Sequence, residues 1–367
     1  MSVSSVTAVT VGKPQVSAFS IPTDSPESDG TLRWDKTVLV VVEAPAADRV
    51  GLGYTYADAA TAKFIADSLA AVVTGQDAMN VPAAWAAMAR EIRNHGRPGI
   101  VSMAMAAVDA ALWDLKARLL ELPLARLLGM VQDGVQAYGS GGFTSYSDRQ
   151  LADQLAGWAD AGLRSVKMKV GREPARDHHR VALARQAIGP KVGLMVDANG
   201  AYSRKQALAM AELFIAAEVS WFEEPVSSDD LAGLHLIRNR APAGMDIAAG
   251  EYGYQPLYFR RMLEAQAVDV LQADASRCGI DGFLAAATMC RARSMPLSCH
   301  CAPALHLHPA TTVEGLHGLE YFHDHVRIEQ MLFDGAVKPQ AGVLKPDLSR
   351  AGNGLELRRA DAQRFAL

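Results

Sequence analysis

From residue 135 onward the sequence repeats one pattern, and this pattern limits the possible folds more than any other feature. Short apolar runs that end in a polar or charged group alternate with amphipathic segments of helical period. The eight runs are VQAYGS, SVKMKV, VGLMVDAN, VSWFEEP, MDIAAGE, VDVLQAD, MPLSCHC and HGLEYFH. Strands that alternate with helices indicate parallel βα units, and eight units predict a closed (β/α)8 barrel of the TIM type in an α/β protein. We place this barrel at residues 131–340.

The second to eighth runs each carry an ionisable side chain at or near their carboxyl ends. These groups recur about 20 to 28 residues apart, which is the length of a strand, a helix and two loops. The carboxyl ends of barrel strands meet on one rim, so we expect the groups to surround a single site. They are Lys167 and Lys169, Asp197, Glu223 and Glu224, Glu251, Asp274, His300, and Glu320.

Three carboxylates on this rim predict a metal site. Asp197, Glu223 and Glu251 end three successive runs, and clustered carboxylates repel one another unless a cation lies among them. Ligation by oxygen atoms alone favours one Mg²⁺ per chain. The alternative is three unrelated surface acids. Glu224 follows Glu223 directly, so we expect it to point away, toward the outer face of the barrel or the next loop.

Two lysines lie inside the strand-like run SVKMKVG. Side chains alternate along a strand, so Lys167 and Lys169 share one face. Lysines on the wet face of an edge strand would explain the pair, but a closed barrel has no edge. We therefore predict that Lys169 is a base whose pKa is lowered by about 3 units through Lys167 and the metal. Lys167 can also hold an oxygen of a substrate carboxylate.

The sixth, seventh and eighth runs supply a candidate acid and an electrophile. Asp274 and His300 end neighbouring strands, and a carboxylate that orients an imidazole makes a general acid or base. Taken alone, His300 would more often be a buried structural residue. Glu320 is predicted to donate a hydrogen bond to a developing oxyanion if burial raises its pKa, and its alternative is a surface glutamate. The adjacent segment His323-Asp324-His325 is interpreted as a loop cluster without a role.

The first 130 residues predict a separate α+β domain. We expect a strand at Ser5 to Val11, a polar connection from Ser20 to Lys36, and a hairpin partner in the run TVLVVVEA. A connection of this length in a compact domain is often a functional lid. From Asp58 to about Gly129 the pattern is helical, with a new short helix starting at Pro123.

Composition excludes several classes of partner. The chain has 367 residues, a formal net charge of −4 and mixed charges along its length, so it shows no basic footprint for nucleic acid or an anionic membrane. No targeting or membrane-spanning pattern is visible, and we expect a soluble cytoplasmic protein.

The four cysteines form no disulfide framework. Cys299-His300-Cys301 lacks a second ligand cluster, which disfavours a structural zinc site.

Taken together, these residues resemble the enolase superfamily and, within it, the mandelate racemase subgroup. Lys167-Met168-Lys169 is similar to the KxK motif of that subgroup, and the likeness covers nearly the whole chain. The segment AAVDAALWDLKARLLELPLARLLG resembles the family's junction between cap and barrel, and residues 341–367 resemble its C-terminal return to the cap. Other matching positions are the three metal ligands Asp197, Glu223 and Glu251, the dyad Asp274 and His300, and the electrophile Glu320. One departure follows Asp274, where the family commonly has two adjacent glycines and this chain has Arg277-Cys278-Gly279-Ile280.

The resemblance implies a capping domain at residues 1–130, whose mobile lid at about 20–36 closes over a small carboxylate substrate. It implies abstraction of the proton α to a carboxylate, through an enediolate stabilised by Mg²⁺. We favour dehydration of a sugar acid to a 2-keto-3-deoxy acid. The alternatives are a racemase or epimerase that uses Lys169 and His300 as opposed bases, and a metal-binding scaffold without turnover. The resemblance also suggests a homo-oligomer.

Overall fold

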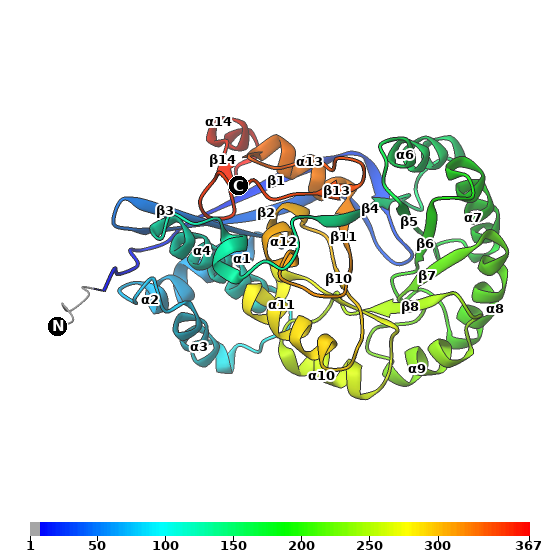
Figure 1. Ribbon diagram of the computed structural model, residues 1–367, viewed down its shortest axis with the longest axis horizontal. Coiled ribbons are helices and arrows are strands. Elements are labelled where there is room, and N and C mark those ends of the chain that lie inside the picture. Colours follow the sequence, from blue (N-terminus) through cyan, green and yellow to red (C-terminus); the bar gives the residue numbers. More distant parts are fainter. Residues whose placement is uncertain (1–7) are drawn as a thin grey trace.

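The computed structural model describes residues 8–367, and a closed parallel barrel forms its larger part (Figure 1). All eight predicted strands are present. They are β4 (Val135–Gly141), β5 (Ser165–Lys169), β6 (Gly193–Asp197), β7 (Val219–Glu223), β8 (Asp246–Ala249), β9 (Val270–Ala273), β10 (Leu297–Cys299) and β11 (Leu316–Phe322). Consecutive strands pair in parallel, and β11 pairs with β4, which closes the barrel.

Helices surround the barrel and connect its strands (Figure 1). They are α6 (Asp148–Asp160), α7 (Pro174–Ile188), α8 (Arg204–Phe214), α9 (Leu231–Arg240), α10 (Pro256–Glu264), α11 (Ala275–Arg291), α12 (Pro303–Ala310) and α13 (His323–Leu332). Capping boxes begin two of them, with Ser147 paired to Gln150 and Ser203 paired to Gln206. Inside the barrel, buried side chains such as Tyr138, Met195 and Trp221 form a small cluster, so the barrel is filled rather than open.

The N-terminal part is a three-stranded antiparallel sheet packed on helices. Its strands are β1 (Gln15–Ser28), β2 (Arg33–Ala46) and β3 (Arg49–Tyr56). Its helices are α1 (Ala60–Phe64), α2 (Ala70–Val73), α3 (Val81–Glu91), α4 (Ile100–Leu119) and α5 (Leu124–Leu128), and a π-helical turn (Ile65–Leu69) joins α1 to α2. Apolar residues of β2 and α4 share a buried core, and the helix predicted to start at Pro123 is confirmed as α5.

The structure differs from the sequence prediction for residues 20–36 and, within the described residues, for residues 8–11. The expected strand at residues 5–11 falls partly outside the described residues, and residues 8–11 contain only an isolated bridge at Thr10. The expected loop at residues 20–36 is mostly β-structure, since β1 and β2 form one long hairpin with a bulge between Pro22 and Glu27. Polar residues and prolines in this stretch are typical of a loop, yet here they continue the ladder as the hairpin extends over the barrel.

The tip of the hairpin rests directly on the barrel rim. Asp29 accepts hydrogen bonds from the backbone N–H groups of Thr31 and Leu32, both at 2.6 Å, and so closes the turn. Gly30 approaches the rim so closely that a Cβ atom there would lie 2.3 Å from the carbonyl oxygen of Ala198. The cap therefore forms one wall of whatever site the rim contains.

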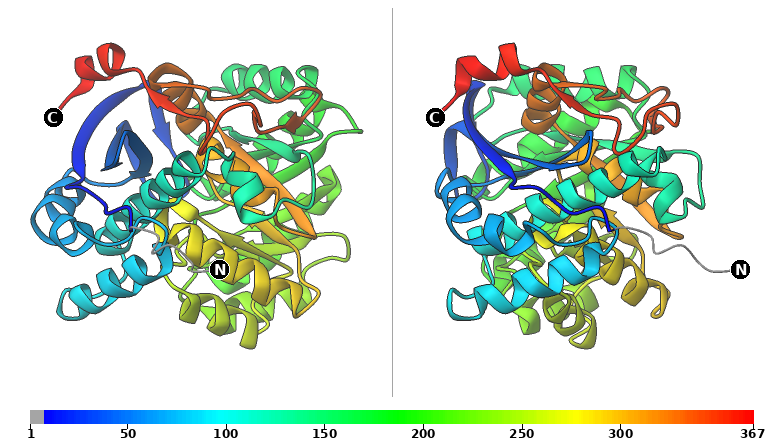
Figure 2. Two further views of the ribbon diagram at one scale, coloured as in Figure 1. Left: turned by 60° about the vertical axis from the view of Figure 1, so that its left-hand side comes forward. Right: turned by 90° about the vertical axis from the view of Figure 1, so that its left-hand side faces the viewer.

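The C-terminal residues return to the cap, as Figure 2 shows for the red segment. They include β12 (Phe333–Asp334), β13 (Val343–Leu344), β14 (Glu356–Leu357) and α14 (Arg359–Ala362). The buried carboxylate of Asp114 in α4 ties three segments together. It accepts hydrogen bonds from the backbone N–H groups of Leu52 at 2.7 Å and Asn353 at 2.5 Å, and from the guanidinium of Arg118 at 2.6 Å. In the described residues, no helix is both long enough and apolar enough to cross a membrane.

Candidate active site

Three carboxylates meet at the carboxyl ends of neighbouring barrel strands, as the sequence predicted. Asp197 ends β6, Glu223 ends β7, and Glu251 follows β8. All three are buried, and one ligand oxygen from each lies within 4.8 Å of the other two. The parallel pairing of Asp197 with Glu223 in the barrel sheet fixes this arrangement.

The electrostatics of this cluster fit a divalent cation. Glu223 Oε1 and Glu251 Oε2 are buried and have no hydrogen-bond partner in the part of the chain that the structure describes. Burial, and then the neighbouring Asp197, raise the pKa of Glu223 to about 7. Buried oxygen atoms without donors are the ligands that Mg²⁺ prefers, so the residues present fit this ion.

The two lysines of β5 are buried and lie on the same face of the strand, beside the carboxylates. Lys169 Nζ is 2.5 Å from Asp197 Oδ2, whereas Lys167 Nζ lies 2.6 Å from Glu223 Oε2 and 2.8 Å from Glu320 Oε1. Burial, the largest single effect, and the charge of Lys167 lower the pKa of Lys169, but the carboxylates of Asp197, Glu223 and Glu251 together outweigh them and raise it overall. The lowering predicted for this pKa depends on a cation bound by the carboxylates, and it stays a prediction.

Asp274 and His300 form the expected pair on the other side of the carboxylates. Asp274 Oδ2 lies 2.8 Å from His300 Nδ1, and Asp274 Oδ1 accepts hydrogen bonds from the backbone and hydroxyl of Ser276. His300 Nε2 is left to face Glu251 Oε2 at 3.3 Å. Burial lowers the pKa of His300, but the nearby Cys301, Glu251 and Asp274 raise it well above its usual value.

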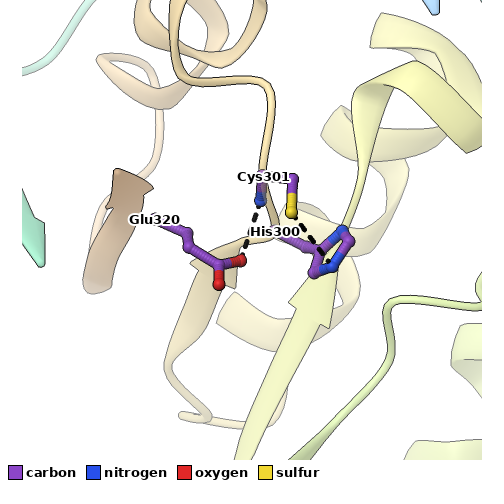
Figure 3. Close-up of side chains that lie close together, drawn as sticks. All are labelled: His300, Cys301 and Glu320. Atoms are coloured by element: carbon purple, nitrogen blue, oxygen red, sulfur yellow. Dashed lines mark hydrogen bonds between the residues drawn. The ribbon is translucent and has the colours of Figure 1, made fainter. Parts of the chain in front are cut away.

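Cys301 is a member of the site that the sequence analysis did not assign. Its thiol Sγ lies 3.3 Å from His300 Nε2, and its backbone N–H donates to Glu320 Oε2 at 2.9 Å (Figure 3). The backbone of Cys301 has a φ of +50°, which turns the thiol toward the imidazole. The adjacent His–Cys pair in the sequence was the only available signal for this contact.

Glu320 and Lys167 lie behind the surface of the cavity. Ser140 Oγ donates to Glu320 Oε1 at 2.6 Å, and Lys167 forms an ion pair with the same oxygen. The expectation that burial would raise the pKa of Glu320 is wrong: burial acts in that direction and is the largest single effect, but Lys167, His300 and Lys169 together outweigh it and the pKa is lowered. Glu320 is therefore a carboxylate here, and it accepts hydrogen bonds instead of donating one.

A cavity of about 410 Å³ opens between the hairpin and the rim. Lys169, Glu251, Asp274 and His300 line it from the barrel. The side chains that line it from the cap include Leu32, Trp34, Lys36, Thr37 and Tyr56. The polar segment predicted as a lid therefore does face the site, although as β-structure; its mobility stays a prediction.

Two further charged residues lie next to the carboxylate cluster. Arg277 Nη1 lies 3.3 Å from Glu251 Oε1, and Arg277 Nε lies 3.5 Å from Asp274 Oδ2, so this guanidinium joins the metal-ligand candidate to the dyad. Glu224, which was expected to point away from the cluster, lines a neighbouring cavity of about 660 Å³ and is buried there. Burial, and then Glu251, raise the pKa of Glu224 well above its usual value.

The single glycine after Arg277 provides the turn that α11 needs. Gly279 has a φ of +77° and kinks the helix, and the next backbone N–H, that of Ile280, donates to Asp109 Oδ2 at 2.8 Å. Ile280 itself is part of the buried core.

The fold is a barrel with an α+β cap over its rim, and the site is a carboxylate cluster flanked by a lysine pair and an Asp–His dyad. Together they define a member of the enolase superfamily. Comparison with known proteins agrees. Residues 21–129 match the mandelate racemase / muconate lactonizing enzyme N-terminal domain, and residues 150–362 match the enolase C-terminal domain-like family. The chain belongs to the mandelate racemase/muconate lactonizing enzyme family.

Individual relatives extend this comparison. A mandelate racemase/muconate lactonizing enzyme-like protein from Rubrobacter xylanophilus is 54% identical, with a TM-score of 0.96 over 98% of this chain and 100% of its own. The 3,6-anhydro-alpha-L-galactonate cycloisomerase of Streptomyces coelicolor is 30% identical over 90% of this chain and 95% of its own. The L-talarate/galactarate dehydratase of Salmonella typhimurium, solved with Mg and L-lyxarohydroxamate, is 26% identical, with a TM-score of 0.90 over 100% of this chain and 95% of its own.

Proposed function

We propose that the protein is a Mg²⁺-dependent lyase that dehydrates a sugar acid to a 2-keto-3-deoxy sugar acid. The observation that carries this proposal is the placement of Lys169 and His300. Each contacts a member of the carboxylate cluster from a different side, Lys169 through Asp197 and His300 through Glu251. A substrate carboxylate held at the cluster would present its α-carbon to one group and its β-hydroxyl to the other.

The roles of the residues follow from their contacts. Asp197, Glu223 and Glu251 would hold Mg²⁺, which when bound supplies the positive charge that stabilises an enediolate. Lys169 removes the proton from the α-carbon, and His300 protonates the departing β-hydroxyl. Asp274 fixes His300 through Nδ1, so that Nε2 is the nitrogen that faces the substrate. Lys167 and Glu320 form the buried ion pair beneath these groups.

The comparisons support a sugar acid as the substrate class. Relatives that are 30% identical include the L-talarate/galactarate dehydratase of Salmonella typhimurium and the arabinonate dehydratase of Saccharolobus solfataricus. The cap side of the cavity carries Lys36 and Thr37, which can bind hydroxyl or carboxylate groups at the far end of such a substrate. If the oxygen on the β-carbon belongs to a ring, the same elimination opens that ring, which agrees with the relatives that are cycloisomerases.

A racemase or epimerase is the second candidate, because two bases on different sides of one carbon are what that reaction needs. A racemase from Streptomyces coelicolor, solved with bound magnesium, has a TM-score of 0.92 and 28% identity to this chain. In this case one of Lys169 and His300 would remove the α-proton from one enantiomer, and the other would protonate the opposite face of the enediolate to give the second enantiomer. The two residues would exchange these roles in the reverse direction.

One experiment separates these reactions. The Mg²⁺-loaded protein is incubated in D₂O with a library of sugar acids, sugar lactones and anhydro sugar acids, and the products are followed by NMR and by a semicarbazide assay for 2-keto acids. A keto acid from an open-chain substrate supports the dehydratase. Deuterium at the α-carbon of an otherwise unchanged acid, with inverted configuration, supports the racemase instead. If none of the acids in the library exchanges its α-proton, both reactions are contradicted.

Two variants assign the bases. Lys169→Met should abolish deuterium exchange at the α-carbon in a dehydratase, whereas His300→Asn should retain some exchange while losing the elimination. Equal loss of exchange in both variants, from either enantiomer, would contradict the separate roles of the two residues.

A further inference from the structure

A second cluster of ligating side chains lies outside the cavity, where the hairpin meets the barrel. Asp24 and Glu27 come from the bulge of β1, and His323 begins α13. One ligand atom from each residue lies within 4.8 Å of the other two, and His323 Nε2 is 3.0 Å from Asp24 Oδ2. The long approach of the hairpin to this end of the barrel is visible in Figure 1.

Glu27 brings a buried carboxylate oxygen without a hydrogen-bond donor to this cluster. Its side chain is 0% exposed, and although Oε2 accepts a hydrogen bond from Trp34 Nε1 at 2.7 Å, Oε1 is buried without a partner in the described residues. Burial, and then the charge of Asp324, raise the pKa of Glu27 to about 8. An unpaired buried carboxylate oxygen costs free energy unless a proton or a cation satisfies it.

The nearest arginine does not fill this need. Arg327 Nη2 donates to Asp324 Oδ1 and to the backbone carbonyl of Pro22, both at 2.6 Å. Asp324 also accepts a hydrogen bond from Thr37 of β2. Nη2 is thus occupied by other acceptors, and Nε is buried without a hydrogen-bond partner in the described residues, so Arg327 does not bond to Glu27. Three carboxylates remain around one imidazole and one arginine.

We propose that Asp24, Glu27 and His323 form a second metal site, which binds Zn²⁺ or a similar transition-metal ion and fastens the hairpin to the barrel. One imidazole nitrogen and two carboxylate oxygens, with water as a fourth ligand, are a donor set that suits Zn²⁺ better than Mg²⁺. Ligand atoms around one Zn²⁺ lie about 3 to 4 Å apart, and His323 Nε2 and Asp24 Oδ2 already lie 3.0 Å apart.

Metal binding at this site would affect the substrate cavity through the side chain of Trp34. The indole of Trp34 donates to Glu27 and also lines the cavity beside the hairpin tip. An ion on Glu27 fixes this carboxylate, and through it the indole that faces the substrate. The ion is therefore predicted to hold the cap in one position relative to the rim without touching the primary carboxylate cluster.

The test is a calorimetric titration of the full-length, Mg²⁺-saturated protein with ZnCl₂. Because replacement of the buried Glu27 would disturb the hairpin itself, the variants are His323→Gln and Asp24→Asn, whose side chains are 24% and 47% exposed. The matched control is His179→Gln, which removes a surface histidine also paired with an aspartate, Asp148, at 2.9 Å. A Glu251→Gln variant reports any Zn²⁺ that enters the primary cluster.

We expect one Zn²⁺ binding event that persists in Glu251→Gln and His179→Gln and weakens at least tenfold in His323→Gln and Asp24→Asn. Zn²⁺ should also raise the thermal midpoint of Glu251→Gln and His179→Gln, because an ion that binds only the folded state stabilises it. It should not raise the thermal midpoint of His323→Gln or Asp24→Asn. Identical isotherms for the wild type and His323→Gln, or loss of all Zn²⁺ binding in Glu251→Gln, would overturn the proposal. Neither readout depends on turnover of a substrate.

Discussion

His308 is predicted to make the protein sensitive to mild acid. It lies in α12, is 2% exposed, and its Nδ1 accepts a hydrogen bond from the backbone N–H of Ala125 in α5 at 3.1 Å. Burial lowers the pKa of His308 from its ordinary 6.5 to about 4, although a backbone contact with Asn353 opposes this. The folded protein therefore keeps this imidazole neutral over a pH range in which the unfolded chain binds a proton.

The sign and size of the effect follow from proton linkage. Between pH 6.5 and about 4 the unfolded state binds more protons than the folded state, so the free energy of unfolding falls as the pH falls through this window. One pKa unit corresponds to 1.36 kcal/mol, so the free energy of unfolding falls by about 3 kcal/mol over the whole window. Between pH 7 and pH 5 it falls by about 2 kcal/mol.

The assay is urea denaturation at pH 7, 6 and 5 for the wild type, His308→Asn and the control His178→Asn, whose histidine is exposed. His308→Asn keeps an acceptor for the Ala125 N–H but does not titrate. Its smaller side chain costs stability at every pH, so only the change with pH is compared. Between pH 7 and pH 5 the wild type and the control should lose about 2 kcal/mol more than His308→Asn. Equal losses in all three proteins would refute the reasoning.

Three further predictions concern other parts of the molecule. Asp114→Ala should lower the free energy of unfolding, measured with urea, by about 3 to 5 kcal/mol, because it leaves two buried N–H donors and Nε of Arg118 without an acceptor; a loss below about 1 kcal/mol would contradict this. Cys301→Ser should reduce kcat about tenfold with little change in KM, because the shorter hydroxyl holds His300 Nε2 less well; an unchanged kcat would remove Cys301 from the site. Removal of divalent ions with EDTA should lower the thermal midpoint, and Mg²⁺ should restore it in the wild type but not in Asp197→Asn; equal recovery in both would contradict the assigned ligands.

The barrel and its carboxylate cluster could be predicted from the sequence because both depend on local patterns. Each strand was a short apolar run, and a parallel barrel places the ends of all its strands on one rim. Asp197, Glu223 and Glu251 therefore had to lie close together once the eight strands were recognised. The shared face of Lys167 and Lys169 followed from the two-residue period of a strand.

The hairpin was not predictable in the same way. Residues 20–36 are polar and contain prolines, which locally favour a loop, but they pair along β1 and β2 and rest on barrel segments that come much later in the chain. Ser28, for example, contacts Thr144 at 2.7 Å, and Asp24 contacts His323 across 299 positions of sequence. No local pattern reports contacts of this kind.

The sequence by itself determined the kind of fold, the order of its strands and the residue types on the rim, because backbone period and strand direction dictate them. Only the tertiary structure decided which charges pair. It placed Glu320 against Lys167, Arg277 between Glu251 and Asp274, and the thiol of Cys301 beside His300. The pKa of a buried group depends on its burial and on neighbours within a few ångströms, and in a barrel those neighbours come from strands far apart in sequence.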